Sequence, residues 1–376
     1  MNLLMPFAHT IPGGIARVAV SLVAEFIRSG DCVVVTVPAK EVEYFRNIFP
    51  KSSNFHLYPD TGVNDLKGYI EKHSINRCLV MNPESLPQAS PDAARFDIPT
   101  TLIVHDVFWA QFQGDDYTTL ANFGQSVYDL HIDSVDNIIV PSHYTRQELL
   151  HAIPTSERKI TCIPHAPDTP SFLKKDASLC LSRKKQDFSL YYPSSATGNK
   201  DHLLLFQAVK MLIENGSSFS LDLSGWETDR FDSENPLIFA RAEKARCFYK
   251  ENRNILREHV RLHGYADYSL IEDLYDACDV VVLPSLYEGF GLGLIEAVAR
   301  GVRVLCSDIP PFLEQISFHS LEPYVTTFRS GDIEDLVGQL LQLNTAAKSN
   351  SICIPPGIIT RTWKDVAGEY RTVLSR

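Results

Sequence analysis

The sequence predicts an α/β protein built from two doubly wound domains, and three observations lead to this fold class. Short apolar, β-like runs alternate with segments of helical periodicity along the chain. The alternation pauses at 167–187, where proline, serine and basic residues are mixed, and then begins again. The length of 376 residues also exceeds what one ordinary core accommodates. Strand–helix alternation in each half indicates a parallel sheet wrapped by helices.

The first predicted domain covers 1–168. A strand near the N-terminus leads into the glycine pair Gly13-Gly14, and Ile15–Ser29 then carries apolar residues at helical spacing. Further strands are expected at short runs rich in aliphatic residues: Cys32–Val37, Cys78–Met81, Thr101–Val104, Asn137–Pro141 and Ile160–Pro164. The segment 169–187 is interpreted as the linker.

The second predicted domain covers 188–355. Its strands are expected at Phe188–Tyr192, Ser220–Ser224, Val260–His263, Val280–Pro284 and Val302–Ser307. The remaining 356–376 contain an amphipathic helix, Thr362–Arg376, that we expect to cross back to the first domain. Doubly wound sheets bind ligands outside the carboxyl ends of their strands. Two facing halves therefore place the expected active site in the cleft between them.

Composition and charge limit the classes of function. Hydrophobic residues make up 44% of the chain and charged residues 22%, so each half can bury a core. The net charge of −11 provides no overall attraction for nucleic acid, and we expect none as a partner. The N-terminus lacks the basic region of a signal peptide, and no apolar run is long enough to cross a bilayer. We expect a cytoplasmic protein, and peripheral contact at the inner membrane face stays open.

The eight cysteines form no C-x-x-C pair, and no His/Cys cluster has the spacing of a zinc motif. Several of them lie in or beside apolar runs, so we expect buried free thiols in a reducing compartment. The eight are Cys32, Cys78, Cys162, Cys180, Cys247, Cys278, Cys306 and Cys353.

Residues 284–308 hold the most informative pattern in the chain. A buried strand ends at Pro284, the glycine-rich turn 289–293 follows, and a helix then runs to a stop at Gly301. Glycines let the backbone approach a ligand closely. The N–H groups and dipole of a helix start favour an anion such as a diphosphate.

Two carboxylates bracket this turn. Glu288 precedes it, and Glu296 lies in the helix, roughly 7 Å beyond Gly291 along the axis. A sugar nucleotide presents sugar, diphosphate and ribose in the same order as Glu288, the helix start and Glu296. Carboxylates accept hydrogen bonds from hydroxyls and repel phosphate, so they suit the two ends of such a ligand. For either glutamate alone, a surface residue beside a glycine-capped helix is the alternative.

On these residues the chain resembles the retaining glycosyltransferases of family 4, whose fold is GT-B. The family signature is two glutamates with seven residues between them, and Glu288 and Glu296 match it. The neighbouring turn 289–291 and the upstream run 263–265 are similar as well. The resemblance covers most of the second half and scattered points of the first.

The resemblance implies a role for each matching residue. Glu288 would hold hydroxyls of the donor sugar, and Glu296 would bind the ribose. The main chain near Gly264 and Tyr265 would face the base. Backbone amides of the turn would hold the distal phosphate, and the donor-binding residues there would be Gly289, Phe290, Gly291 and Leu292.

Lys200 resembles the family lysine that neutralises the leaving diphosphate. The family often has an arginine about five residues earlier, where this chain has Ser195 among its donor-site residues. One leaving-group charge is therefore missing. Either hydroxyls and Arg17 substitute for it, or turnover is reduced. Apart from the resemblance, Lys200 is compatible with a solvated lysine at a helix start.

In the first half, Gly13, Gly14 and Arg17 resemble the family's N-terminal glycine loop, which opens the first helix and suits an anion. His105, at the carboxyl end of its strand, resembles a family histidine that lies beside the reacting sugar. A glycine pair alone also marks an ordinary turn, and a lone histidine is often structural. Asp106 is alternatively a cap of the next turn.

The resemblance implies retaining transfer of a sugar from a UDP- or GDP-sugar to a saccharide or lipid-linked saccharide acceptor, in polysaccharide or cell-envelope glycan synthesis. His105, Lys200 and Glu288 would be the catalytic residues. It implies no cofactor and no metal, and the acidic run 114–117 is interpreted as surface charge. Two alternatives stay open. One is a catalytically weak binding or scaffold protein of the same fold, and the other is an NAD-dependent oxidoreductase, although the first loop lacks G-x-G-x-x-G spacing.

Overall fold

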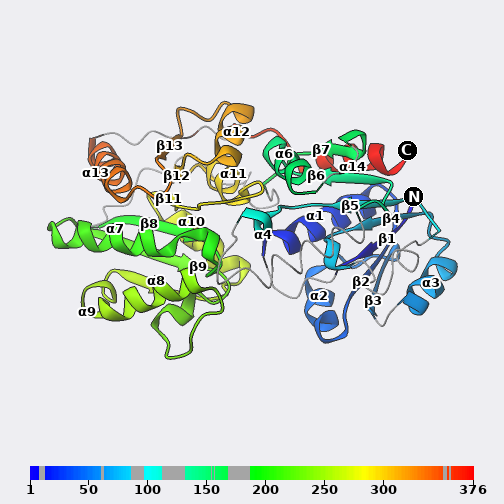
Figure 1. Ribbon diagram of the computed structural model, residues 1–376, viewed down its shortest axis with the longest axis horizontal. Helices are drawn as coiled ribbons and strands as arrows, with labels where there is room; N and C mark the ends of the chain where they lie inside the picture. Colours follow the sequence, from blue (N-terminus) through cyan, green and yellow to red (C-terminus); the bar gives the residue numbers. More distant parts are fainter. Residues whose placement is uncertain are drawn as a thin grey trace. The chain divides into compact units, whose positions relative to one another are not determined.

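The computed structural model describes residues 1–7, 13–60, 63–85, 97–111, 132–153, 155, 157–167, 187–349, 354 and 357–376. The chain divides into two compact units, the first made of 1–166 and 361–376 and the second of 167–360. Each unit is a parallel sheet with helices packed against it (Figure 1). This confirms the predicted class of two doubly wound, Rossmann-like α/β folds. The expected linker lies outside the described residues, apart from Asp187.

The first unit holds a seven-stranded parallel sheet in the order β3-β2-β1-β4-β5-β6-β7. The order reverses between β1 and β4, which pair with each other. The five strands predicted after the glycine pair are present, but β3 was not expected. The strands are β1 (Asn2–Pro6), β2 (Cys32–Pro38), β3 (Phe55–Asp60), β4 (Arg77–Val80), β5 (Thr100–Ile103), β6 (Asn137–Val140) and β7 (Ile160–Cys162).

Helices cover this sheet, and the last helix of the chain is one of them. The described helices of the unit are α1 (Gly14–Arg28), α2 (Val42–Ile48), α3 (Val63–Lys72), α4 (Phe108–Gln111), α6 (His143–Ala152) and α14 (Trp363–Leu374). α14 packs on α1. Its Arg371 pairs with the buried Asp31 at 2.6 Å, and Arg77 Nε donates to Leu374 O at 2.5 Å. The C-terminal helix is therefore fixed to the first unit by charge as well as by packing.

The second unit holds a six-stranded parallel sheet in the order β10-β9-β8-β11-β12-β13. The order reverses between β8 and β11, so the two sheets share the same winding. The strands are β8 (Phe188–Pro193), β9 (Phe219–Ser224), β10 (Val260–Leu262), β11 (Val280–Leu283), β12 (Arg303–Ser307) and β13 (Val325–Phe328). The helices are α7 (His202–Glu214), α8 (Ala240–Glu251), α9 (Arg253–Leu256), α10 (Tyr268–Ala277), α11 (Leu292–Ala299), α12 (Pro310–His319) and α13 (Ile333–Ser349).

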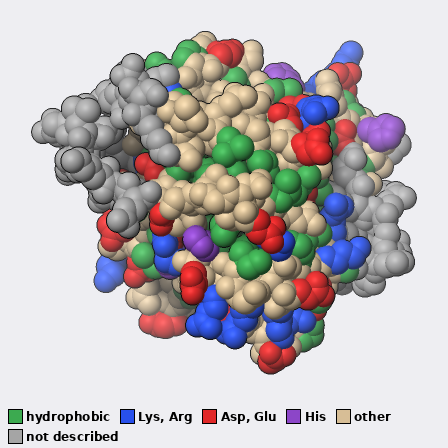
Figure 2. Space-filling view, turned by 90° about the vertical axis from the view of Figure 1, so that its left-hand side faces the viewer, with side chains coloured by type: hydrophobic (Ala, Val, Ile, Leu, Met, Phe, Trp, Pro, Cys, Tyr) green, Lys and Arg blue, Asp and Glu red, His purple; other side chains and the backbone are tan. Residues whose placement is uncertain are grey.

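The surface of the second unit carries mixed charge. Figure 2, seen from the side of α9 and α13, shows acidic and basic side chains interspersed over the described part of this face. Some of them are paired, such as Lys250 with Glu234 and Arg253 with Asp232, both at 2.7 Å. Among the described residues, no helix combines the length and the apolar character that crossing a membrane requires.

The thiols depart in part from the expected burial. Cys78 and Cys306 are buried, but Cys247 is exposed on α8. It occupies a helix position on the solvent side, where a small side chain is tolerated without a packing role. Cys180 and Cys353 lie outside the described residues.

Candidate donor-binding site

Two loops meet at the reversal of strand order in the second sheet. β8 pairs with β11 through Val280 and Leu190. The loop 194–200 follows β8, and the loop 284–291 follows β11. Chain segments that leave neighbouring strands at such a reversal run to opposite sides of the sheet and open a crevice at its carboxyl edge. The topology therefore brings together two loops that the sequence analysis singled out.

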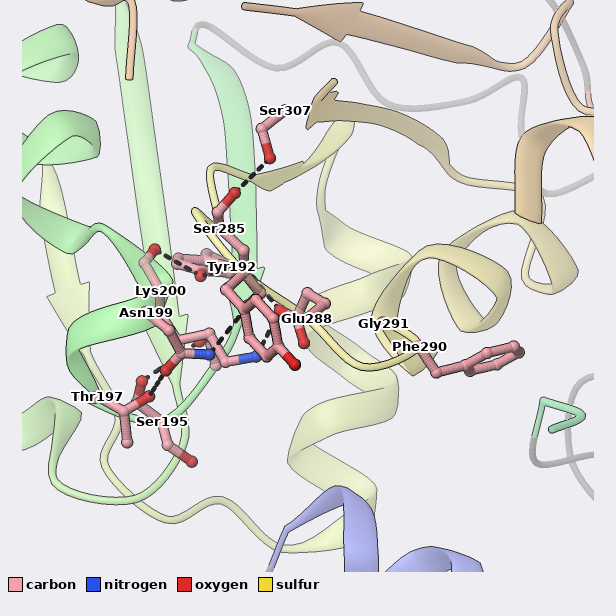
Figure 3. Close-up of polar contacts among 12 residues, drawn as sticks. Tyr192, Ser195, Thr197, Asn199, Lys200, Ser285, Glu288, Phe290, Gly291 and Ser307 are labelled. Carbon is pink, nitrogen blue, oxygen red and sulfur yellow. Dashed lines mark hydrogen bonds and ion pairs between the residues drawn. The ribbon is translucent and has the colours of Figure 1, made fainter. Parts of the chain in front are cut away.

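Lys200 and Glu288 form an ion pair across these two loops (Figure 3). Lys200 Nζ lies 2.5 Å from Glu288 Oε1, and Ser285 Oγ donates to the same oxygen at 2.7 Å. The side chains are 21% and 14% exposed, so the pair is partly shielded from water yet still open to a ligand. A solvated helix-start lysine, the alternative for Lys200, does not describe this environment.

Tyr192 contacts both loops. Its hydroxyl donates to Lys200 O at 2.8 Å and lies 3.3 Å from Ser285 Oγ. Burial, followed by the Glu288 carboxylate, raises the pKa of Tyr192, so the phenol keeps its proton as a donor. Ser307 Oγ donates to Ser285 O at 2.5 Å and holds the second loop to β12. Sequence reasoning missed Tyr192 and Ser285, because their positions at strand ends give no signal in one sequence.

Asn199 ties the two loops to each other. Its side-chain amide donates to Tyr287 O at 3.0 Å, and its main-chain carbonyl accepts from Leu286 N at 2.8 Å. Thr197 Oγ1 donates to the Asn199 side chain at 2.8 Å. These bonds fix the spacing between Lys200 and Glu288 through the backbone. Asn199 was not singled out from sequence, although it stands next to Lys200.

Ser195 occupies the place where the resembling family often has an arginine. The main chain around it is held closely, since Ser194 N donates to Ser224 O at 2.8 Å. A Cβ on Gly225 would lie 2.3 Å from Ser194 O, so only glycine fits beside this loop. Lys200 is the one basic residue in the loops 194–200 and 284–291. The site therefore offers a single positive side chain from these loops.

The start of α11 has the backbone geometry of an anion site. Gly291 is the N-cap in the left-handed region, with φ of 81° and no capping side chain. A Cβ there would lie 2.3 Å from the ring of Phe312, so glycine is required both for conformation and for space. Gln315 Nε2 donates to the carbonyl of Phe290. No side chain caps the first turn of α11, and within that turn Leu294 N donates to Gly291 O at 3.1 Å.

Glu296 is more deeply placed than a ribose-binding group at a groove surface would be. The residue is 2% exposed. The hydroxyl of Tyr275 donates to Glu296 Oε2 at 3.3 Å, and the guanidinium of Arg300 lies 5.0 Å from the centre of the Tyr275 ring. Little of this residue is open to a ligand, and its role in ribose binding stays a prediction.

The predicted base-facing residues lie in the loop after β10. Gly264 has φ of 64°, and its carbonyl accepts from Gly225 N at 2.7 Å. A Cβ on Gly264 would lie 2.9 Å from Asp229 Oδ1. Tyr265 is 56% exposed. This loop is thereby joined to the β9 loop beside Ser195.

The remaining predicted residues belong to the first unit. Gly13 is the N-cap of α1, ahead of Gly14, and it is extended with φ of −177° and no atom within 4 Å of an added Cβ. Its conformation does not demand glycine, so Gly13 carries less structural constraint than Gly291. Arg17 is half-buried on α1, and its backbone N–H donates to Gly13 O at 3.1 Å. The preceding residue, Pro12, lies outside the described residues, as does the acidic run 114–117.

His105 stands two residues beyond β5 and is half-buried. Its Nε2 hydrogen-bonds to Met81 O at 2.9 Å. Asp106 Oδ1 accepts from Phe108 N at 3.3 Å, so it caps α4, the alternative considered for it. His165, missed from the sequence, lies with its ring 5.9 Å from that of His105 and is 2% exposed. Burial, then the charges of His105 and Arg361, hold the pKa of His165 well below its usual value.

Comparison with known families agrees with this geometry. Residues 181–354 match the family model of the glycosyl transferases group 1, and residues 12–170 match that of glycosyltransferase family 4. Among curated proteins, the chain is 26% identical to O-antigen chain mannosyltransferase B of Escherichia coli over 195 residues, 49% of this chain and 46% of the relative. It is 25% identical to mannosylfructose-phosphate synthase of Agrobacterium fabrum, over 59% of this chain and 48% of the relative. The chain thus spans less than half the length of these curated relatives.

Solved structures are similar over the whole chain. Sucrose-phosphate synthase from Thermosynechococcus elongatus superposes with a TM-score of 0.75 at 17% identity, over 100% of this chain and 99% of that one. The Anabaena protein HepE in complex with UDP-glucose gives 0.70 at 14% identity, over 100% and 97%. At these identities the likeness establishes the fold, GT-B. The reaction has to be inferred from the residues of this chain.

Proposed function

We propose that this chain, which belongs to glycosyltransferase family 4, transfers a sugar from a nucleotide-diphosphate donor to a saccharide acceptor. The observation that carries the proposal is the Lys200–Glu288 pair at the strand-order reversal of the second unit. The pair places a cation for phosphate next to a carboxylate for hydroxyls, at the edge where such sheets bind nucleotides. A sugar joined to a diphosphate requires both groups side by side.

The donor occupies the two loops in a defined direction. Its distal phosphate contacts Lys200 and the N–H groups at the start of α11, where positive charge and the helix dipole act together. Its sugar hydroxyls donate to Glu288, and its ribose meets the edge of Glu296. Tyr265 covers the base. We propose a UDP- or GDP-sugar, and the HepE complex with UDP-glucose supports the first of these.

The reaction retains the anomeric configuration. The acceptor hydroxyl attacks the anomeric carbon from the face that the phosphate leaves. The carbon–oxygen bond to phosphate breaks as the new glycosidic bond forms, and a phosphate oxygen takes the hydroxyl proton. Lys200 and the helix start stabilise the charge that develops on the leaving diphosphate, which is the protein's main contribution. His105 is proposed to contact the reacting sugar, and Gly13, Gly14 and Arg17 to complete the phosphate site.

The acceptor is proposed to be a saccharide or a lipid-linked saccharide in glycan synthesis. The names of the relatives support this class, since one acts on the O-antigen chain. α2 is not part of the proposed acceptor site. Its Phe45 is buried and packs edge-on against Phe7 at 5.2 Å, which favours a role in the core of its own unit.

A binding or scaffold protein of the same fold is the second candidate. The observation that favours it is Ser195, since the single cation Lys200 carries the leaving-group charge in the two loops. Donor hydrolysis separates the two candidates, because a transferase turns over its donor slowly with water when no acceptor is supplied.

The test is to incubate the protein with UDP-glucose, UDP-N-acetylglucosamine and GDP-mannose and to follow release of the nucleoside diphosphate. We expect release from one of them and loss of that release in Lys200→Ala. Binding of a donor with no release at any enzyme concentration would favour the scaffold.

A further inference from the structure

Three metal-binding side chains meet at the amino edge of the first sheet. A sulfur of Cys32 and one ring nitrogen each of His56 and His73 all lie within 4.8 Å of one another. Cys32 is a free thiol, and the rings of His56 and His73 are 4.2 Å apart between centroids. All three side chains are half-buried. No part of the proposed sugar transfer uses them.

The strand register explains why they meet. Val34 pairs with His56, and Cys32 stands two residues before Val34, so both side chains leave the sheet on the same face. Val34 belongs to the core that includes Leu66 of α3, so α3 covers this face. His73 directly follows the end of α3. The start of β2, the start of β3 and the end of α3 therefore lie together at one edge of the sheet.

The surroundings orient the His73 ring. Tyr58 OH hydrogen-bonds to His73 Nε2 at 3.0 Å and also accepts from Lys72 Nζ at 3.1 Å. Asn2 Nδ2 donates to His73 O at 3.1 Å and holds the main chain that carries the ring. Metal-binding histidines commonly have such a partner on the second ring nitrogen, because it fixes the tautomer and the ring plane.

One thiolate and two imidazoles select borderline divalent transition metals, with zinc the commonest of them in proteins. On a tetrahedral zinc centre these atoms stand about 3.3–3.6 Å apart. Small side-chain rotations from within 4.8 Å reach that spacing. We propose that Cys32, His56 and His73 bind a zinc-like divalent cation, with water or a further oxygen as fourth ligand. On binding, the Cys32 S–H bond breaks, the sulfur bonds to the metal and the proton passes to solvent.

This site would be structural and separate from sugar transfer. Cys32 is the first residue of β2, so the site lies at the edge where the parallel strands begin. Ligands of a doubly wound sheet bind at the opposite, carboxyl edge. A metal here would join β2, β3 and the end of α3, and would stabilise the edge strand β3 against fraying. No zinc motif is visible in the sequence, because the three ligands come from separate elements.

Cobalt is the probe, since Co²⁺ takes tetrahedral zinc sites and reports a thiolate ligand by charge-transfer absorption in the near ultraviolet. The purified full-length chain is treated with a chelator, desalted and titrated with Co²⁺ alone. We expect a thiolate–cobalt band that saturates at one metal per chain and is displaced by Zn²⁺. Cys32→Ser should abolish the band, and His73→Asn should weaken binding at least tenfold.

Cys247→Ser is the matched control, because that thiol is exposed on the second unit. It should keep the full band. His56→Asn tests the ligand that β3 contributes. The melting curve of each metal-free variant shows whether that variant folds. Zn²⁺ should raise the melting temperature of the wild type more than that of His56→Asn. A wild type without the band, or a band that persists in Cys32→Ser, would overturn the proposal whatever the donor assays show.

Discussion

The ammonium of Lys200 and the carboxylate of Glu288 stand 2.5 Å apart, although 88 residues separate them in sequence. The contact spans the strand-order reversal of the second sheet, and Tyr192 and Asn199 hold both sides of it. We propose that a diphosphate bound to Lys200 would compete with this carboxylate for the ammonium and leave Glu288 to accept from the sugar hydroxyls. In that proposal, one contact links phosphate binding to sugar binding.

Lys200→Ala should lower kcat by about a hundredfold or more while KM changes far less, because the lysine stabilises charge that grows in the transition state. Donor turnover measured at saturating donor checks this. Lys200→Arg should recover part of the rate. Lys210→Ala, which removes a surface lysine paired with Glu214, should behave as wild type. An unchanged kcat in Lys200→Ala would remove the lysine from the mechanism.

Glu296→Gln should weaken binding of the nucleoside diphosphate by about tenfold, the cost of one hydrogen bond to a charged acceptor. Titration calorimetry with the diphosphate alone measures it. Glu214→Gln, on the surface of α7, is the matched control. Since Glu296 is 2% exposed, equal affinity in both variants would assign it to the core rather than to the ribose.

Gly291→Ala should destabilise the second unit by several kcal/mol, because an added Cβ would lie 2.3 Å from the Phe312 ring. Gly216→Ala introduces the same left-handed strain, with φ of 75°, into open space. It should cost about 1 kcal/mol. Thermal melts of the two variants distinguish the cost of backbone strain, which both share, from the cost of the steric clash with Phe312, which only Gly291→Ala has. Equal losses would show that the ring moves aside freely.

Because His202, next to the site, is buried, we expect the stability of the folded protein to depend on pH. It is 2% exposed, and burial, followed by the charge of Lys200, lowers its pKa to about 3. The unfolded chain takes up a proton near pH 6.5 while the folded chain does not, so stability falls as pH drops from about 6.5 toward 3. The slope from this residue is at most about 1.4 kcal/mol per pH unit.

Between pH 6.5 and 5, the melting temperature of His202→Leu should fall less steeply than that of the wild type, because the contribution of His202 is removed. His151→Leu, at an exposed position, should follow the wild-type curve. A His202→Leu curve parallel to wild type across this range would show that the buried ring is protonated in the folded state.

A chelator should leave sugar transfer intact, since in the proposed mechanism Lys200 and the start of α11 supply the charge that a metal would otherwise provide. The rate is measured with and without EDTA at a temperature well below the melting point. Loss of activity that Mg²⁺ restores would contradict the proposed mechanism. Lower thermal stability without loss of rate would instead fit the structural metal site of the first unit.

The sequence predicted the central strands but not both edges. Val280–Leu283 is buried throughout, and its continuous apolar run identifies it. β3 and β13 are edge strands with half-buried positions, and β3 includes His56 and Pro59, so neither shows such a run. The other two edge strands, β7 and β10, were predicted, so the composition of β3 and β13 rather than edge position alone concealed them.

The candidate site could be predicted only where the motif is local. Glu288, Gly291 and Glu296 lie within one strand–turn–helix unit, so their spacing carries information. Tyr192 and Asn199 act through hydrogen bonds to residues brought near by the fold, and one sequence does not encode such partners visibly. The burial of Glu296 likewise depends on Tyr275 of another helix.

The most direct test is the thermal stabilisation of the protein by UDP, GDP and ADP in the presence of a chelator. A ligand at a hundred times its Kd stabilises the folded state by about 2.7 kcal/mol, which a melting curve resolves. We predict that one diphosphate raises the melting temperature of the wild type and fails to do so in Glu296→Ala. If none of the three shifts the wild type, or if wild type and variant shift equally, the second unit does not bind its donor at this site and the central claim is wrong.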